Sequence, residues 1–171
     1  AEVEEVAAIE GFATVATTKH DYRIVRSAVE LQELVDHLAT FAEFCFDTET
    51  TGLDPISCRI VGISFAAEPF KAWYVPFSDA NRENYIKVLR PLFENEAIAK
   101  IGQNIKYDIM VLHKLGIEVR GTKIDTMLLH YLLDSESRHN MDFLAERYLN
   151  YSPISIETLI GKGAKQLTMD M

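Results

Sequence analysis

The sequence predicts a single α/β domain in which a mixed β-sheet carries helices on both of its faces. Two observations indicate this class. Three segments rich in β-branched and aromatic residues follow one another in the first half of the chain, and strand and helix patterns alternate in the second half. With 171 residues, of which 48% are hydrophobic, the chain can bury about 70% of its unfolded surface in one core.

The N-terminal segment differs from the rest of the chain in composition. Residues 1–20 are acidic, rich in alanine and weakly patterned, so we expect a linker that could include a short helix, and we place the domain at 21–171. The domain opens with a strand over 22–25, and a helix then begins after Ser27, a residue type that caps helix N-termini. The apolar positions of this helix are Val29, Leu31, Leu34, Val35 and Leu38.

Three strands are predicted next, separated by the turn-forming sequences DPIS and EPFK. The short connections between them favour antiparallel hairpins. The strands are expected over 43–49, 59–68 and 72–77.

From Arg82 onward, helices alternate with short strands, which completes a mixed sheet. Helices are predicted from Arg82, from Asn104 to Leu115, from Asp125, over 141–149 and over 155–161. Strands are predicted over 97–102 and near 118–121. The expected inward side chains are Tyr85, Ile86, Leu89, Leu92 and Phe93 in the first of these helices and Met127, Leu128, Tyr131 and Leu132 in the third.

Charge and cysteine content restrict the classes of function. The net charge of −9 is unusual for a protein that binds nucleic acid, so either the ligand is different or cations and further domains supply the attraction. Cys45 and Cys58 lie in segments read as strands, which indicates buried thiols in a reducing compartment. No apolar run reaches the roughly 20 residues of a membrane span, and no signal peptide is recognisable. We therefore expect a cytoplasmic protein with no membrane partner.

Two carboxylates lie two residues apart in FDTETTGLD, at the end of the first hairpin strand. Side chains alternate across a strand, so Asp47 and Glu49 should project from one face while Phe46 and Thr48 project from the other. On its own, an Asp-x-Glu pair is usually a solvated strand end.

A third carboxylate, Asp108, lies in GQNIKYD on the same helical face as Asn104. Alone, this spacing is usually a helix cap followed by an exposed acid. Three acids that converge without an Arg or Lys partner in either motif repel one another unless a divalent cation lies among them. Oxygen ligands without histidine or thiolate favour Mg²⁺ or Mn²⁺ over Zn²⁺.

Together the motifs carry a family resemblance. FDTETTGLD, GQNIKYDIMVL with IDTMLLHYLL, and RHNMDFLAERYL resemble, in this order, motifs of the proofreading 3′–5′ exonuclease domain of bacterial DNA polymerase I (family A), within the DEDD exonuclease superfamily. The resemblance runs from about Tyr22 to the C-terminus and implies an RNase H-like fold. It also implies two-metal-ion hydrolysis of the 3′-terminal phosphodiester of DNA, with release of nucleoside 5′-monophosphates.

By this resemblance, Asp47, Glu49 and Asp108 correspond to three of the family's catalytic, metal-binding acids, with Asp47 shared by both ions. The DNA contacts that it implies are Thr50, Leu53, Gln103, Asn104, Tyr107 and Arg138. Leu53 corresponds to an apolar side chain that wedges against the terminal bases. The implied partners are a single-stranded or frayed 3′ end of DNA and a polymerase domain in the same parent chain, and the isolated piece is expected to be monomeric.

The sequence departs from the family in its third motif, Tyr-x3-Asp or His-x4-Asp, which supplies a fourth acid and a group that orients the attacking water. No Tyr or His here has Asp at that spacing. In the family the motif follows the segment that reads GKGAKQLT here, so we expect a chain truncated before its last catalytic acid, with weak or no activity. Two alternatives stay open: an RNA-trimming DEDD exonuclease, and a vestigial fold that only supports a polymerase.

Other residues have simpler interpretations. Asp125 is expected to cap a helix rather than bind metal. GKGAKQ lacks the phosphate-loop pattern and is expected to be a mobile loop. Trp73 and Tyr74 are expected to pack within the sheet rather than stack on bases. Five histidines lack metal-ligand spacing and are expected at the surface or locally hydrogen-bonded: His20, His37, His113, His130 and His139.

Overall fold

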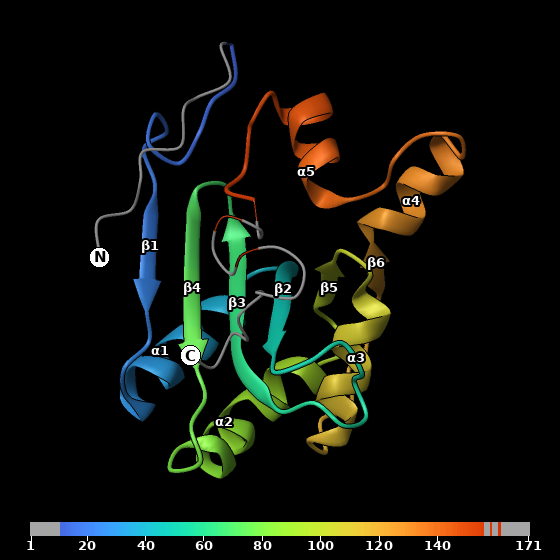
Figure 1. Cartoon of the computed structure of the whole chain (residues 1–171). Helices are drawn as coiled ribbons and strands as arrows, with labels where there is room; N and C mark the ends of the chain where they lie inside the picture. Colours follow the sequence, from blue (N-terminus) through green and yellow to red (C-terminus); the bar gives the residue numbers. More distant parts are fainter. Residues whose placement is uncertain (1–10, 156–157, 159–160, 162–171) are drawn as a thin grey trace.

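The computed structural model of the protein describes residues 11–155, 158 and 161. Within these residues, six strands form one mixed sheet in the order β1-β4-β3-β2-β5-β6 (Figure 1). Pairing among β2, β3 and β4 is antiparallel, as the sequence predicts, whereas β1, β5 and β6 join through parallel pairs. The strands are β1 (Asp21–Ile24), β2 (Glu43–Thr50), β3 (Ile60–Glu68), β4 (Lys71–Pro76), β5 (Ala99–Gly102) and β6 (Lys123–Asp125).

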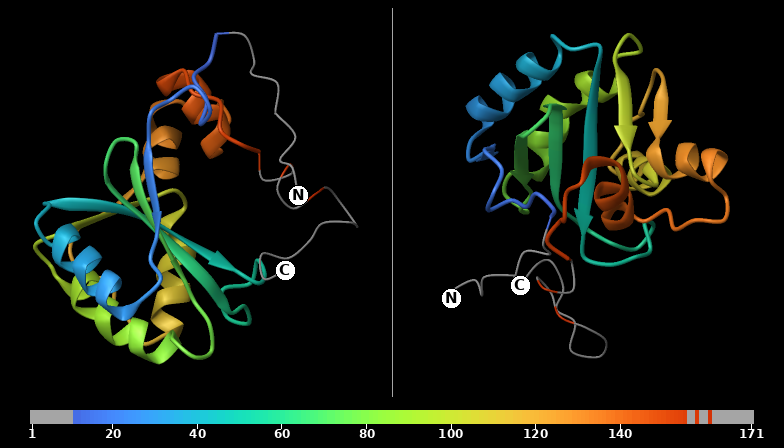
Figure 2. Two further views of the ribbon diagram at one scale, coloured as in Figure 1. Left: turned by 90° about the vertical axis from the view of Figure 1, so that its left-hand side faces the viewer. Right: turned by 90° about the horizontal axis from the view of Figure 1, so that it is seen from above.

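Helices cover both faces of this sheet, as predicted. Helices α1 and α2 lie on one face, and α5 lies over the other (Figure 2). The helices are α1 (Ala28–Leu38), α2 (Arg82–Glu94), α3 (Ile105–Lys114), α4 (Thr126–Leu133) and α5 (Met141–Leu144), with a π-helical turn η1 (Ala145–Leu149) after α5. The predicted cap of α1 is confirmed, because the Ser27 hydroxyl accepts the Glu30 N–H at 3.2 Å. No helix in the described part of the chain is long and apolar enough to cross a membrane.

The core between the sheet and its first two helices is built on aromatic side chains. Phe44 and Phe46 of β2 point into it and contact Phe93 of α2, with ring centroids 5.7 and 4.9 Å apart from that ring. Because side chains alternate along a strand, burying these two rings turns Cys45, Asp47 and Glu49 toward the opposite face. Core packing therefore determines which face carries the acids.

A buried lysine fixes the outer part of the sheet. The Lys100 ammonium, fully buried on β5, donates to the carbonyls of Asn95 at 2.5 Å, Ile98 at 2.9 Å and Arg120 at 3.0 Å. Arg120 is followed by Gly121, which has a positive φ of 76° and would place a Cβ 2.6 Å from a backbone oxygen. The strand predicted near 118–121 is therefore displaced to β6, because this stretch turns to meet the lysine.

Two expectations about burial were wrong. On α4, Leu128, Tyr131 and Leu132 are exposed and His130 is buried instead, because the helix extends past the end of the sheet and contacts the described chain mainly along its histidine side. Cys45 is exposed, because it lies on the face of β2 opposite the core, whereas Cys58 is buried; both thiols are free.

The helix predicted over 141–149 is present as α5 and η1. The helix predicted over 155–161 and the GKGAKQ loop fall largely outside the described residues, as do residues 1–10. Between residues 11 and 20, Ala13 forms an isolated bridge with Tyr151.

Candidate active site

The three predicted acids lie near the point where strand β2 is no longer paired with strand β5. Strand β5 pairs with β2 as far as Cys45 and Ile101, and it ends one residue later, which leaves the next part of this edge open. Helix α3 follows β5 directly and places Asp108 against the open edge. The Thr48 N–H donates to Oδ1 of Asp108 at 2.8 Å, and the Thr48 hydroxyl donates to the same oxygen at 2.5 Å. Asp108, which is only 2% exposed, thus replaces the missing strand as hydrogen-bond acceptor.

The other two acids lie on the adjoining face of β2. Asp47 pairs with Ser64 and Glu49 with Gly62 across the β2–β3 ladder. Burial, and after it the negative charges of Asp108 and Glu49, together raise the pKa of Asp47 to about 7. The same two causes, burial and the charge of Asp108, raise the pKa of Glu49. The charge of Asp108 therefore acts on both other acids, and that of Glu49 acts on Asp47, which places the three in one electrostatic cluster.

Asp108 is held in this cluster by opposing effects. Burial raises the pKa of its carboxyl, whereas the two hydrogen bonds from Thr48 lower it, and the charge of Asp125 raises it. Hydrogen bonds that favour the ionised form allow a carboxylate to stay charged in a buried place.

The donor set fits a hard divalent cation. Within residues 11–155, no salt bridge to Lys or Arg neutralises the three acids. As they stand, no three Asp, Glu, His or Cys side chains of the described residues converge tightly enough to hold an ion. Carboxylate oxygens that lack a cationic partner are the donors that Mg²⁺ and Mn²⁺ prefer, and Thr48 occupies only one oxygen of Asp108. The chemistry of the donors therefore matches such an ion, although the described side chains do not enclose one.

The turn after β2 forms one rim of the site. Tyr107 of α3 donates from its hydroxyl to the Gly52 carbonyl at 2.7 Å and lies 2.6 Å from the Thr50 hydroxyl. This links the helix that carries Asp108 to the turn, and Leu53 projects from the same turn with 96% of its surface exposed. An apolar side chain held in water by an anchored turn is available for contact with a ligand.

Gln103 lies at the junction of β5 and α3. Its amide nitrogen donates to the His139 carbonyl at 2.6 Å, and its amide oxygen accepts a hydrogen bond from the Thr126 hydroxyl. Both ends of the amide are therefore used inside the described chain, which ties β5 to α4 and to the loop that follows it.

Asn104 is exposed and has left-handed backbone angles, with φ 58° and ψ 41°. Its N–H donates to Oδ1 of Asp125 at 3.0 Å. The same oxygen accepts the N–H groups of Met127 and Leu128, so the prediction that Asp125 caps α4 is confirmed. Arg138 is exposed in the loop between α4 and α5, and no salt bridge within the described residues joins it to the three acids.

Sequence reasoning missed three groups around the site. Thr48 was assigned only to the core face, although its backbone and hydroxyl hold Asp108. Tyr74 was assigned to sheet packing, although burial and then the charge of Glu49 raise the pKa of its phenol. The third group is a pair of histidines in direct contact, His130 and His139, whose Nδ1 atoms lie 2.7 Å apart. No local pattern marks any of these contacts, because each joins residues on different elements or in a loop.

With this geometry established, comparison with known proteins identifies the family. The profile of a family described as 3′–5′ exonuclease matches residues 22–171. The chain belongs to the 3′–5′ exonuclease family. Among related proteins, DNA polymerase I of Pseudomonas aeruginosa is 40% identical over 161 residues, which cover 88% of this chain and 18% of that protein. DNA polymerase I of Rhizobium leguminosarum is 34% identical over 188 residues, which cover 95% of this chain and 18% of that protein. This 3′–5′ exonuclease domain of the DNA polymerase I type spans less than a fifth of either relative.

Solved structures confirm the fold of the exonuclease domain. RNase D of Trypanosoma brucei superposes with a TM-score of 0.71 at 16% identity, covering 83% of this chain and 52% of that one. NrnC of Brucella melitensis superposes with a TM-score of 0.61 at 20% identity, covering 84% of this chain and 63% of that one. Both superpositions cover more than four fifths of this chain, so the RNase H-like fold predicted from the motifs is confirmed.

Proposed function

We propose that this exonuclease domain hydrolyses the 3′-terminal phosphodiester of DNA and releases nucleoside 5′-monophosphates, as the proofreading activity of a DNA polymerase in the same parent chain. The observation that supports this most strongly is the cluster of Asp47, Glu49 and Asp108 at the open edge of β2, within a chain of this family. The proposal also accounts for the net charge of −9, since an acidic protein can meet a polyanion through cations bound at one site.

Mg²⁺ or Mn²⁺ would be held by Asp47, Glu49 and Asp108, and when bound would supply activation of water and stabilisation of charge on the phosphate. Neighbouring residues of the chain favour binding of the ion at this site. Thr48 holds Asp108 with two hydrogen bonds, and the crowding of three carboxylates makes binding of a cation favourable. The anchored turn with Leu53 would meet the terminal base, and Thr50 and Tyr107 would line the path of the strand.

The choice of DNA over RNA follows from the closer relatives. Those with 34% and 40% identity are DNA polymerases, whereas the RNase D of Trypanosoma brucei solved with the RNA U12 shares 17% identity. The discriminating experiment compares 5′-labelled single-stranded DNA with RNA of the same sequence, digested by the full-length polymerase that carries this domain. We expect DNA to shorten from its 3′ end with release of deoxynucleoside 5′-monophosphates. Faster loss of RNA would favour the RNA-trimming alternative, and no loss of either would favour a vestigial fold.

We further propose that the 171 residues alone bind divalent ions weakly and hydrolyse DNA slowly. They contain no Tyr-x3-Asp, so the water-orienting group and fourth acid implied by the family resemblance are lacking. Mg²⁺ binds weakly to sites with few carboxylates unless substrate phosphate completes its shell. Calorimetric titration with Mn²⁺ and a digestion assay should both improve in a chain extended through the next Tyr-x3-Asp. Equal affinity and rate in the two chains would show that the site is complete without that motif.

A further inference from the structure

Tyr74 reaches the catalytic face from two strands away. It lies in β4, and β3 separates it from the acids of β2. On β3, Ser64 pairs with Tyr74, while Gly62, two residues earlier on the same face, pairs with Glu49. A Cβ added to Gly62 would lie 2.1 Å from the Tyr74 hydroxyl oxygen and 2.3 Å from the ring carbon that bears it. The end of the phenol therefore occupies the space that any other side chain at position 62 would fill.

This position brings the hydroxyl to Glu49. Directly paired residues of antiparallel strands point to the same face, with Cβ atoms about 4.5–5.5 Å apart. Since the Tyr74 oxygen lies where a Cβ of Gly62 would be, it faces Glu49 across a single strand spacing, within reach of a glutamate side chain. The raised pKa of the Tyr74 phenol, caused by burial and by the charge of Glu49, agrees with this proximity.

Packing between the strands does not require the hydroxyl of Tyr74. Within the described residues no hydrogen bond uses it, so a phenylalanine ring would fill the same space between the strands. Glycine inside a strand weakens the strand and often marks a close approach by another group, as it does at Gly62. The sheet therefore accommodates the full length of the tyrosine and leaves its polar end beside the acids.

We propose that Tyr74 is a positioning residue for Glu49, whose carboxylate it orients by donating a hydrogen bond from its hydroxyl. The inference rests on the proposed exonuclease function. A phenol suits this role, because it is a neutral donor that does not compete as a cation for the carboxylates. Glu49 has three side-chain torsions and accepts no hydrogen bond from the described residues, so a single donor aimed at it restricts the orientation of its oxygens toward Asp47 and Asp108.

The test compares Tyr74→Phe with Tyr22→Phe in the full-length polymerase. The first keeps the ring and removes only the hydroxyl; the second is a control that removes an exposed hydroxyl from β1. For hydrolysis of single-stranded DNA, we expect Tyr74→Phe to lower kcat about tenfold, the effect of one hydrogen bond to a charged group, without changing KM or the unfolding midpoint. Mn²⁺ affinity, measured by electron paramagnetic resonance of the free ion, should fall severalfold in the same variant. Tyr22→Phe should change none of these quantities.

The outcomes separate this inference from the function on which it rests. If the wild type digests DNA, Asp47→Asn does not, and Tyr74→Phe matches the wild type in kcat and Mn²⁺ affinity, the positioning role is wrong and the function stands. A raised KM with unchanged kcat also overturns the role, because it would indicate a contact with DNA instead. If the wild type leaves DNA intact, the proposed function fails, and the Mn²⁺ affinities alone decide whether Tyr74 acts on Glu49.

Discussion

Asp47→Asn should stabilise the metal-free protein at alkaline pH. The folded state raises the pKa of Asp47 from 3.8 to about 7, through burial and the charges of Asp108 and Glu49. Between these two values the folded protein holds a proton that the unfolded chain has released, so the free energy of unfolding falls as pH rises through this window. A pKa difference of about 3 corresponds to a loss of at most about 4 kcal/mol, fully developed near pH 8. Asparagine has a similar shape and no charge, so the variant escapes this loss.

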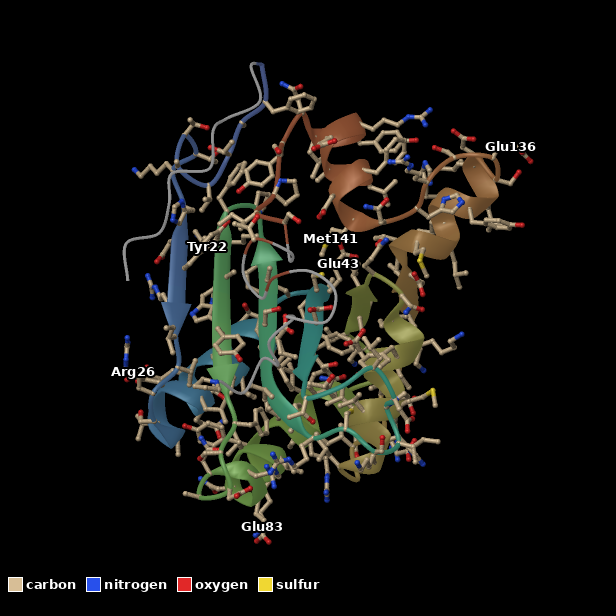
Figure 3. The ribbon with its side chains drawn as sticks, in the orientation of Figure 1. Tyr22, Arg26, Glu43, Glu83, Glu136 and Met141 are labelled. Atoms are coloured by element: carbon tan, nitrogen blue, oxygen red, sulfur yellow. The ribbon has the colours of Figure 1, made fainter. Side chains whose placement is uncertain are left out.

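Urea unfolding in the presence of a chelator, at pH 5 and pH 8.5, measures the effect. Wild type should lose stability between the two values, and Asp47→Asn should lose less, because only Glu49 and Asp108 then contribute with the same sign. Glu43→Gln is the matched control, since Glu43 is an exposed acid at the opposite end of the same strand (Figure 3). Equal stability of the wild type at both pH values, or a gain for Glu43→Gln as large as that for Asp47→Asn, would show that folding does not raise the pKa of Asp47.

Three further substitutions test the exposed leucine, the support of Asp108 and the buried lysine. Leu53→Ala should slow digestion of duplex ends more than of single strands, because only a duplex must be opened, and equal slowing would rule out a wedge. Thr48→Val removes the hydroxyl bond to the buried Asp108 and should lower the free energy of unfolding by about 1.5–3 kcal/mol near pH 8.5; an unchanged urea midpoint would contradict this. Lys100→Met leaves three carbonyls without their donor and should cost about 3 kcal/mol or more in thermal or urea unfolding, whereas a midpoint within error of wild type would show that water replaces the lysine.

Much of the fold could be predicted because its determinants are local. Alternation of apolar residues predicted the hairpins of β2, β3 and β4, and a capping serine predicted the start of α1. The position of β6 could not be predicted, because it depends on where the buried Lys100 draws in the carbonyl of Arg120. Periodicity also marked the apolar positions of α4 but could not show whether anything covers them.

The candidate site likewise has one feature that local sequence determines and others that depend on tertiary contacts. That Asp47 and Glu49 share a face is a property of any strand, so their spacing was sufficient to predict it. Their meeting with Asp108 depends on β5 ending beside Cys45, a tertiary feature that the spacing within the motifs does not encode. The hydrogen bond from Thr48 to Asp108 spans 60 positions of sequence, and the electrostatic effect of Glu49 on Tyr74 spans 25, so no local pattern encodes either.

The proposed function requires that Asp47, Glu49 and Asp108 form one hydrolytic site for the 3′ end of DNA. The most direct test is the rate at which the full-length polymerase that carries this domain releases a labelled 3′-terminal nucleotide from single-stranded DNA in Mg²⁺. We expect Asp108→Asn to lower this rate by about a hundredfold or more, because the site loses a charged ligand, while Glu43→Gln releases the label at the wild-type rate. Release at the wild-type rate by Asp108→Asn would show that Asp108 takes no part in hydrolysis.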